Sequence, residues 1–308
     1  MTKRLQTQKQ AAINLVRPAY QECQSTIGPV TVTKTRSHHA ADRDRNSGTQ
    51  AAPITKVGEG ILMPTRPEKV YYFGTCLIDL CYPQAGMAGI ELLRREGIQV
   101  VYPQQQSCCG QPAYNSGFPE QARKVARQQL KAFPKDYPIV VPSGSCGGML
   151  KHHYPKLFAD APEDAEAQRF AGRVFELTEF LAKVLEVRLE DRGQPIRVTW
   201  HSSCSALREM RVIEYSKSLV RQLKNVEVIE LQRERECCGF GGSFSVKQAD
   251  LSSAMVADKV ADIEQTGASL LLSGDCGCLM NIGGALKHRN SPIPARHVAE
   301  FILERTHG

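Results

Sequence analysis

Residues 70–76 read Val-Tyr-Tyr-Phe-Gly-Thr-Cys, and residues 198–204 read Val-Thr-Trp-His-Ser-Ser-Cys. Each stretch is rich in β-branched and aromatic residues, which is typical of a strand, and each ends in small residues and a cysteine. A helical pattern, a second apolar run, a Cys-Cys-Gly triplet, another helical pattern and a third apolar run follow in both places. We expect strands at 70–73, 98–102 and 138–141, and again at 197–200, 226–231 and 269–272.

The spacing of the cysteines indicates an internal duplication. Three landmarks recur in one order: Cys76 and Cys204 (128 residues apart), Cys108 and Cys237 (129 apart), and Cys146 and Cys278 (132 apart). Nearly constant offsets of this kind are typical of two copies of one unit. The alternation of strands and helices predicts an α/β fold with two homologous repeats, each an open, mostly parallel sheet with flanking helices. We expect the repeats to occupy residues 67–190 and 191–308.

Helical patterns fill the intervals between the expected strands. We expect helices at about 76–96 and 119–132 in the first repeat, and at about 204–223 and 248–267 in the second. In an open α/β sheet, ligands bind outside the carboxyl ends of the strands. Because the recurring cysteines follow strands, one sheet edge could present all four sulfurs of a repeat together.

Charge and hydropathy exclude two classes of function. The chain of 308 residues has a formal net charge of +7, but residues 1–66 contribute +6 of it and residues 67–308 only +1. We predict that residues 1–66 form a basic tail that is disordered or weakly ordered. The nearly neutral remainder offers no basic footprint for nucleic acid. No apolar run approaches the ~20 residues that span a bilayer, so we expect no transmembrane segment.

The eleven cysteines predict metal binding. Thiolates ligate iron–sulfur clusters, commonly four per cluster. Each repeat offers four in matching places: Cys76, Cys108, Cys109 and Cys146 in the first, and Cys204, Cys237, Cys238 and Cys278 in the second. Structural zinc sites show two closely spaced pairs of ligands, whereas only the middle pair is close here. This spacing favours iron–sulfur clusters over zinc, and it leaves zinc open as the metal of one repeat.

Residues around the cysteine sets suggest further roles. Gly110 and Gly239 permit the irregular turn that two adjacent cysteines need in order to point the same way. Cys276 is a candidate extra ligand, two residues before Cys278. Cys23 and Cys81 are interpreted as an incidental thiol and a core thiol. Three histidines neighbour the cysteine sets: His152, His153 and His201. We expect them to hydrogen-bond the nearby backbone, and the alternative is that they tune or ligate a cluster.

The duplicated motif resembles the cysteine-rich CCG domain, which occurs in heterodisulfide reductase and in the iron–sulfur subunit of glycolate oxidase. Within that group, three stretches are similar to the lactate-utilization protein A family: residues 108–117, 237–247 and 277–282. In the heterodisulfide reductase relative each motif ends in Cys-x-x-Cys, whereas Ser143 and Asp275 stand at the first of those positions here. The resemblance therefore implies an ordinary cluster, expected to be [4Fe-4S], or an open iron position, instead of the relative's noncubane cluster.

The resemblance implies an iron–sulfur electron-transfer subunit of a complex that oxidises L-lactate to pyruvate, an oxidoreductase component that is inactive without its partners. It implies two of these, a ferredoxin-type iron–sulfur subunit and a third subunit, and a location in the cytoplasm or at the periphery of the inner membrane. Two alternatives stay open: an electron-transfer subunit for another 2-hydroxy acid such as glycolate, and a zinc-bound scaffold subunit.

Overall fold

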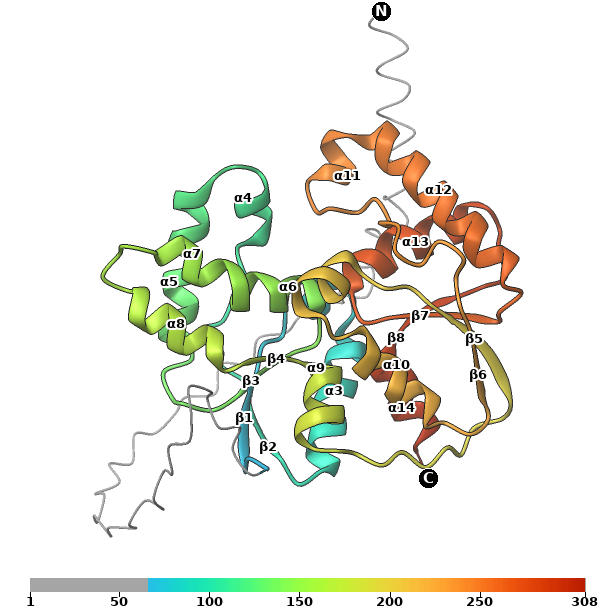
Figure 1. Ribbon diagram of the computed structural model, residues 1–308, viewed down its shortest axis with the longest axis horizontal. Coiled ribbons are helices and arrows are strands. Elements are labelled where there is room, and N and C mark those ends of the chain that lie inside the picture. Colours follow the sequence, from blue (N-terminus) through green and yellow to red (C-terminus); the bar gives the residue numbers. More distant parts are fainter. Residues whose placement is uncertain (1–65, 308) are drawn as a thin grey trace, which may run out of the picture.

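The computed structural model describes residues 66–307 (Figure 1). The predicted basic tail at 1–66 lies outside the described residues except for Arg66, as does Cys23. Among the described residues the chain forms two four-stranded sheets with helices around them. The first sheet and its outer helices come from the first half of the described chain, and the second sheet comes from the other half.

The first sheet is entirely parallel, with the strand order β2-β1-β3-β4. Its strands are β1 (Lys69–Tyr72), β2 (Gln99–Val101), β3 (Ile139–Val141) and β4 (Val174–Glu176). The central strand β3 is buried along its whole length, because helices cover both faces of a parallel sheet. The three predicted strands of this half are confirmed, whereas β4 was not predicted.

The second sheet repeats the same topology, with the order β6-β5-β7-β8 and only parallel pairs. Its strands are β5 (Ile196–Trp200), β6 (Val226–Ile229), β7 (Leu270–Ser273) and β8 (Ala295–His297). The central strand β7 is again fully buried. The predicted α/β class with two parallel sheets is therefore confirmed.

Ten helical segments belong to the first half of the described chain. They are α2 (Cys76–Cys81), α3 (Pro83–Arg95), α4 (Gln111–Asn115), α5 (Pro119–Ala132), α6 (Gly144–Gly148), the π-helical turn η1 (Met149–His153), α7 (Tyr154–Phe158), α8 (Asp164–Gly172), α9 (Leu177–Glu179) and the π-helical turn η2 (Phe180–Val184). The single helix expected at 76–96 is divided at Pro83, whose ring and missing N–H start a new helix instead of continuing the old one.

Six helical segments belong to the second half of the described chain. They are the π-helical turn η3 (Ala206–Met210), α10 (Ile213–Arg221), α11 (Phe244–Lys247), α12 (Ala249–Gln265), α13 (Cys276–His288) and α14 (Val298–Arg305). The helix expected at 204–223 is interrupted at Arg211, which adopts a left-handed conformation with φ of 55°. The segment therefore divides into η3 and α10.

One hydrophobic core joins the two sheets. Helices α3, α10 and α14 lie between the sheets, and their apolar side chains pack in one cluster with Val140 of the first sheet and Leu272 of the second (Figure 1). Alternate residues of the same strands face outward, because side chains alternate along a strand. Val141 packs in an outer cluster with α5 and α8, and Leu271 packs in another with α12 and α13.

The strand order sets where a ligand would bind. In the first sheet the chain runs from β1 to its neighbour β2 and then crosses to β3 on the other side of β1, so the strand order reverses between β1 and β3. In the second sheet the strand order reverses in the same way between β5 and β7. Open α/β sheets bind ligands in the crevice outside the carboxyl ends of the strands at such a reversal. Cys76 and Cys146 follow β1 and β3, and Cys204 and Cys278 follow β5 and β7.

Candidate metal centre

A single cavity of about 220 Å³ lies where the carboxyl ends of the two sheets meet. All eight cysteines named from the sequence line it, together with Cys276. The cavity thus brings together sulfurs that are as far apart in the chain as Cys76 and Cys278. Its lining also includes Gln111, Asn115 and Phe240.

The first cysteine set comes from three separate loops. Cys76 begins α2, the Cys108-Cys109 pair follows β2, and Cys146 lies in α6 after β3. The Sγ atoms of Cys76 and Cys108 are 3.8 Å apart. Cys109 is in hydrogen-bond contact with both Cys108 and Cys146. The four thiols therefore form one continuous group, close enough to share a small metal centre.

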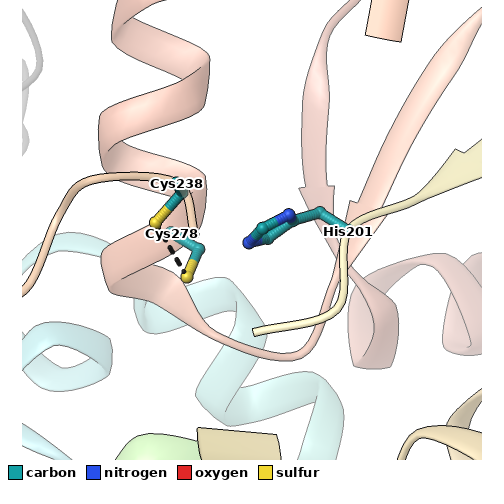
Figure 2. A group of neighbouring side chains, drawn as sticks. All are labelled: His201, Cys238 and Cys278. Atoms are coloured by element: carbon teal, nitrogen blue, oxygen red, sulfur yellow. Dashed lines mark hydrogen bonds between the residues drawn. The ribbon is translucent and has the colours of Figure 1, made fainter. Parts of the chain in front are cut away.

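The second set repeats this arrangement. Cys204 follows β5, and its thiol contacts that of Cys237. Cys238 donates to Cys278 across 3.2 Å between the two Sγ atoms (Figure 2). Cys238 and Cys278 are buried, Cys237 is half-buried, and Cys204 is exposed. The second set is therefore open to solvent at one corner and closed on the side of the sheet.

One sulfur of each set is held as a thiolate. The Cys108 sulfur accepts hydrogen bonds from the thiols of Cys109 and Cys76, and the backbone N–H of Gly110 donates to it at 3.5 Å. These contacts lower the pKa of Cys108 to about 3. The thiols of Cys204 and Cys238 lower the pKa of Cys237 to about 2 in the same way. Metals bind the thiolate form of cysteine, so the lowered pKa values of Cys108 and Cys237 favour binding of a metal cation in both sets.

A glycine after each cysteine pair makes the turn possible. Gly110 has φ of 86° and Gly239 has φ of 81°, in the left-handed region that glycine adopts without strain. A Cβ atom at Gly239 would also lie 2.8 Å from the carbonyl oxygen of Ser252. The predicted irregular turn is confirmed at both positions.

Asp275 connects the two sets. Its Oδ1 accepts from the hydroxyls of Ser143 at 3.0 Å and Ser145 at 2.7 Å, and its Oδ2 accepts from the backbone N–H of Ser145 at 2.9 Å. Ser203 donates to the same Oδ2 at 2.8 Å. In the sequence, Ser143 and Asp275 are distinguished only as positions where the related motif has a cysteine. Their pairing across 132 residues has no local signal in the sequence.

His201 departs from the expected pattern. Its side chain is only 1% exposed, yet neither ring nitrogen has a hydrogen-bond partner among the described residues. The expectation that it hydrogen-bonds the nearby backbone is therefore wrong. A ring nitrogen of His201 and the Sγ atoms of Cys238 and Cys278 all lie within 4.8 Å of one another. Figure 2 shows the ring directed toward the two sulfurs. Burial lowers the pKa of His201 to about 3, so the imidazole is neutral and able to ligate a metal.

A buried lysine distinguishes the second set from the first. Lys259 of α12 is fully buried and donates to the carbonyl oxygen of Arg233, just before the second cysteine pair. Gln129 of α5 is equally buried and bonds to Ser107, just before the first pair. The two helices thus hold the two loops in comparable ways, but only the second places a lysine there, with its Nζ 3.9 Å from Oδ2 of the buried Asp262.

A family model described as a cysteine-rich domain matches the chain twice, at residues 70–151 and 198–283. Lactate utilization protein A of Bacillus licheniformis is 45% identical over 240 residues, which make up 77% of this chain and 100% of that protein. The chain belongs to the lactate utilization protein A family. Lactate utilization protein A of Geobacillus kaustophilus is also 45% identical, over 77% of this chain and 99% of its own length.

A solved structure supports the fold. A hypothetical protein from Helicobacter pylori superposes with a TM-score of 0.57 at 10% identity, over 80% of this chain and 51% of that one. At this identity the likeness concerns the fold alone. The cysteine-rich domain model matches this family member twice. One match begins in β1 and the other near the start of β5, as expected of a duplication.

Cys276 also lines the cavity, beside the two cysteine sets. Cys276 starts α13, is buried, and lies near the carboxylates of Asp275 and Glu300. Burial raises the pKa of its thiol well above the usual range. Its role as an extra ligand stays a prediction.

In this family member, no helix of the described residues 66–307 is long and apolar enough to cross a membrane.

Proposed function

We propose that this chain is an iron–sulfur electron-transfer component of a system that oxidises L-lactate to pyruvate. One observation carries the proposal: two sets of four thiols line a single cavity in a member of the lactate utilization protein A family. The donor set fits iron–sulfur chemistry, because each set supplies four sulfurs from loops that the sheets hold together.

The chain's own residues would do three things at this site. The eight cysteines, Cys76, Cys108, Cys109, Cys146, Cys204, Cys237, Cys238 and Cys278, would hold the metal centres. The N–H groups of Gly110 and Gly239 would stabilise charge on sulfur, because they point at Cys108 and Cys237. The hydrophobic clusters beside Cys109 and Cys238 would keep water from the inner side. A bound cluster would supply reversible one-electron transfer.

The proposed reaction requires partner subunits. Oxidation of L-lactate to pyruvate removes two electrons and two protons, whereas an iron–sulfur cluster passes electrons on one at a time. The sequence has no closely spaced ferredoxin-type cysteine run. We therefore propose that a ferredoxin-type iron–sulfur subunit and a third subunit complete the complex, in the cytoplasm or at the inner membrane surface, and that this chain alone does not turn over lactate.

Metal analysis tests the cofactor. The chain is purified anaerobically, and iron, acid-labile sulfide and zinc are measured together with absorption and EPR spectra. We expect iron and sulfide in equal amounts and an EPR signal after reduction. A colourless protein that contains zinc and no sulfide would instead indicate the zinc-bound scaffold.

Growth tests the substrate. A strain that lacks the gene is grown on L-lactate and on glycolate, with the gene restored as the control. We expect loss of growth on L-lactate only. Loss on glycolate alone would assign the chain to another 2-hydroxy acid. A restored copy with Cys237→Ser and Cys238→Ser should fail to rescue growth, because it keeps the chain but lacks the pair.

A further inference from the structure

His201 has the features of a metal ligand. Its ring nitrogens are buried and unpartnered among the described residues, although buried polar groups in proteins are nearly always hydrogen-bonded. A neutral imidazole must lose its hydrogen bonds to water when it is buried, and this costs free energy unless a partner replaces them. The sulfurs of Cys238 and Cys278 lie within 4.8 Å of its ring nitrogen, so a metal ion between them would provide that partner.

The backbone and the neighbours of His201 fix its place. Its N–H donates to the carbonyl oxygen of Leu272 at 2.8 Å, which continues the pairing of β5 with β7. Ser202 accepts from the indole of Trp200 at 3.1 Å and donates to Glu234 at 2.5 Å. The residues on either side of His201 are therefore held, and the ring enters the cavity from a rigid strand end.

The first repeat has no such group. Cys76 of the first repeat corresponds to Cys204 of the second. His201 stands three residues before Cys204, and Phe73 stands at the corresponding position three residues before Cys76. Phe73 is fully buried and packs in the hydrophobic cluster of the first half. The two cysteine sets therefore differ in one donor atom, although their sulfurs are arranged alike.

We propose that His201 ligates the metal of the second cysteine set through a ring nitrogen, beside Cys238 and Cys278, and that the first set is ligated by thiolates alone. The assignment of iron rests on the proposed function, whereas the nitrogen ligand does not. The imidazole is neutral, so it adds a donor atom to the second centre without adding negative charge.

The test isolates the second centre. Cys108→Ser and Cys109→Ser together remove the pair of the first set, and the protein is then prepared anaerobically with histidine labelled by ¹⁵N in the ring. Pulsed EPR of the reduced protein detects a nitrogen bonded to iron. X-ray absorption at the metal edge detects an imidazole on either iron or zinc.

Two further variants are made in this background. His201→Ala removes the proposed ligand, and His288→Ala, an exposed residue at the end of α13, is the matched control. We expect the ¹⁵N coupling and the imidazole scattering in the background and in His288→Ala, and their loss in His201→Ala.

The outcomes separate the two proposals. Iron with no bonded nitrogen overturns the assignment of His201 and leaves the electron-transfer proposal standing. Zinc with an imidazole ligand supports the assignment of His201 and overturns the electron-transfer role of the second cysteine set. Protein that binds neither metal after anaerobic reconstitution contradicts both. The labelled background needs no change at His201, so the test holds even if His201→Ala does not fold.

Discussion

The hydroxyl of Ser143 donates a hydrogen bond to Oδ1 of Asp275 across 3.0 Å, and both side chains are buried. Ser143 stands three residues before Cys146, and Asp275 stands three residues before Cys278. The two positions that correspond to each other in the repeats are therefore in direct contact. This contact holds the carboxyl ends of the two sheets against one cavity.

Replacement of the Asp275 carboxylate should loosen that junction. Asp275→Asn puts an amide where four donors now converge, so at least one donor loses its acceptor. Loss of a buried, charged acceptor costs about 2–4 kcal/mol of unfolding free energy. Urea unfolding measures the loss, with the exposed Asp250→Asn as the control. Equal stability of the two variants would show that the network contributes little.

The two cysteine pairs should bind metal separately. Cys108→Ser with Cys109→Ser should remove about half of the iron, and Cys237→Ser with Cys238→Ser the other half, because each set has four sulfurs of its own. Cys81→Ser serves as the control, since Cys81 does not line the cavity. Iron and sulfide analysis gives the ratios. Complete loss of iron in either double variant would indicate one shared centre instead of two.

The buried cation beside the second set should set its potential. Lys259→Gln installs the side chain that Gln129 supplies in the first half, and it removes a positive charge that stabilises the reduced centre. We expect the potential of the second centre to fall by on the order of 50 mV, the effect of one partly screened charge nearby. An EPR-monitored redox titration measures it. The exposed Lys247→Gln should leave the potential unchanged.

Glu176 should make stability depend on pH. The carboxyl is buried at the end of β4, and burial raises its pKa from 4.5 to about 7. In the unfolded chain it ionises near 4.5, so the folded protein binds the extra proton between these values. Stability from this group is present below pH 4.5 and is lost as pH rises through 7, by roughly 3 kcal/mol.

Glu176→Gln keeps an oxygen that accepts from the N–H of Thr178 and cannot ionise. We expect the variant to match the unsubstituted protein at about pH 4.5 and to be more stable at about pH 8. Urea unfolding at several pH values measures the difference. A constant difference across that range would contradict the raised pKa.

The sequence was sufficient for the repeated core. The runs at 70–73, 138–141 and 269–272 are apolar because parallel strands are covered on both faces, so they are visible without tertiary information. The helix expected at 119–132 matches α5 at both ends, since Pro119 marks its start. Strands β4 and β8 are not predicted from the sequence, because a strand of three residues such as Val174–Glu176 is too short to show the alternation of apolar and polar residues.

The order of the cysteines in the chain is enough to match Cys76 with Cys204 and to assign four sulfurs to each half. A duplication keeps nearly constant the number of residues between matching cysteines of the two repeats, and this offset is visible in the sequence. Only the folded chain decided that both sets face one cavity, that Ser143 meets Asp275, and that His201 has no partner among the described residues. Those relationships depend on how two sheets pack against shared helices. Packing of that kind joins residues more than a hundred positions apart, where no local pattern of side chains can record it.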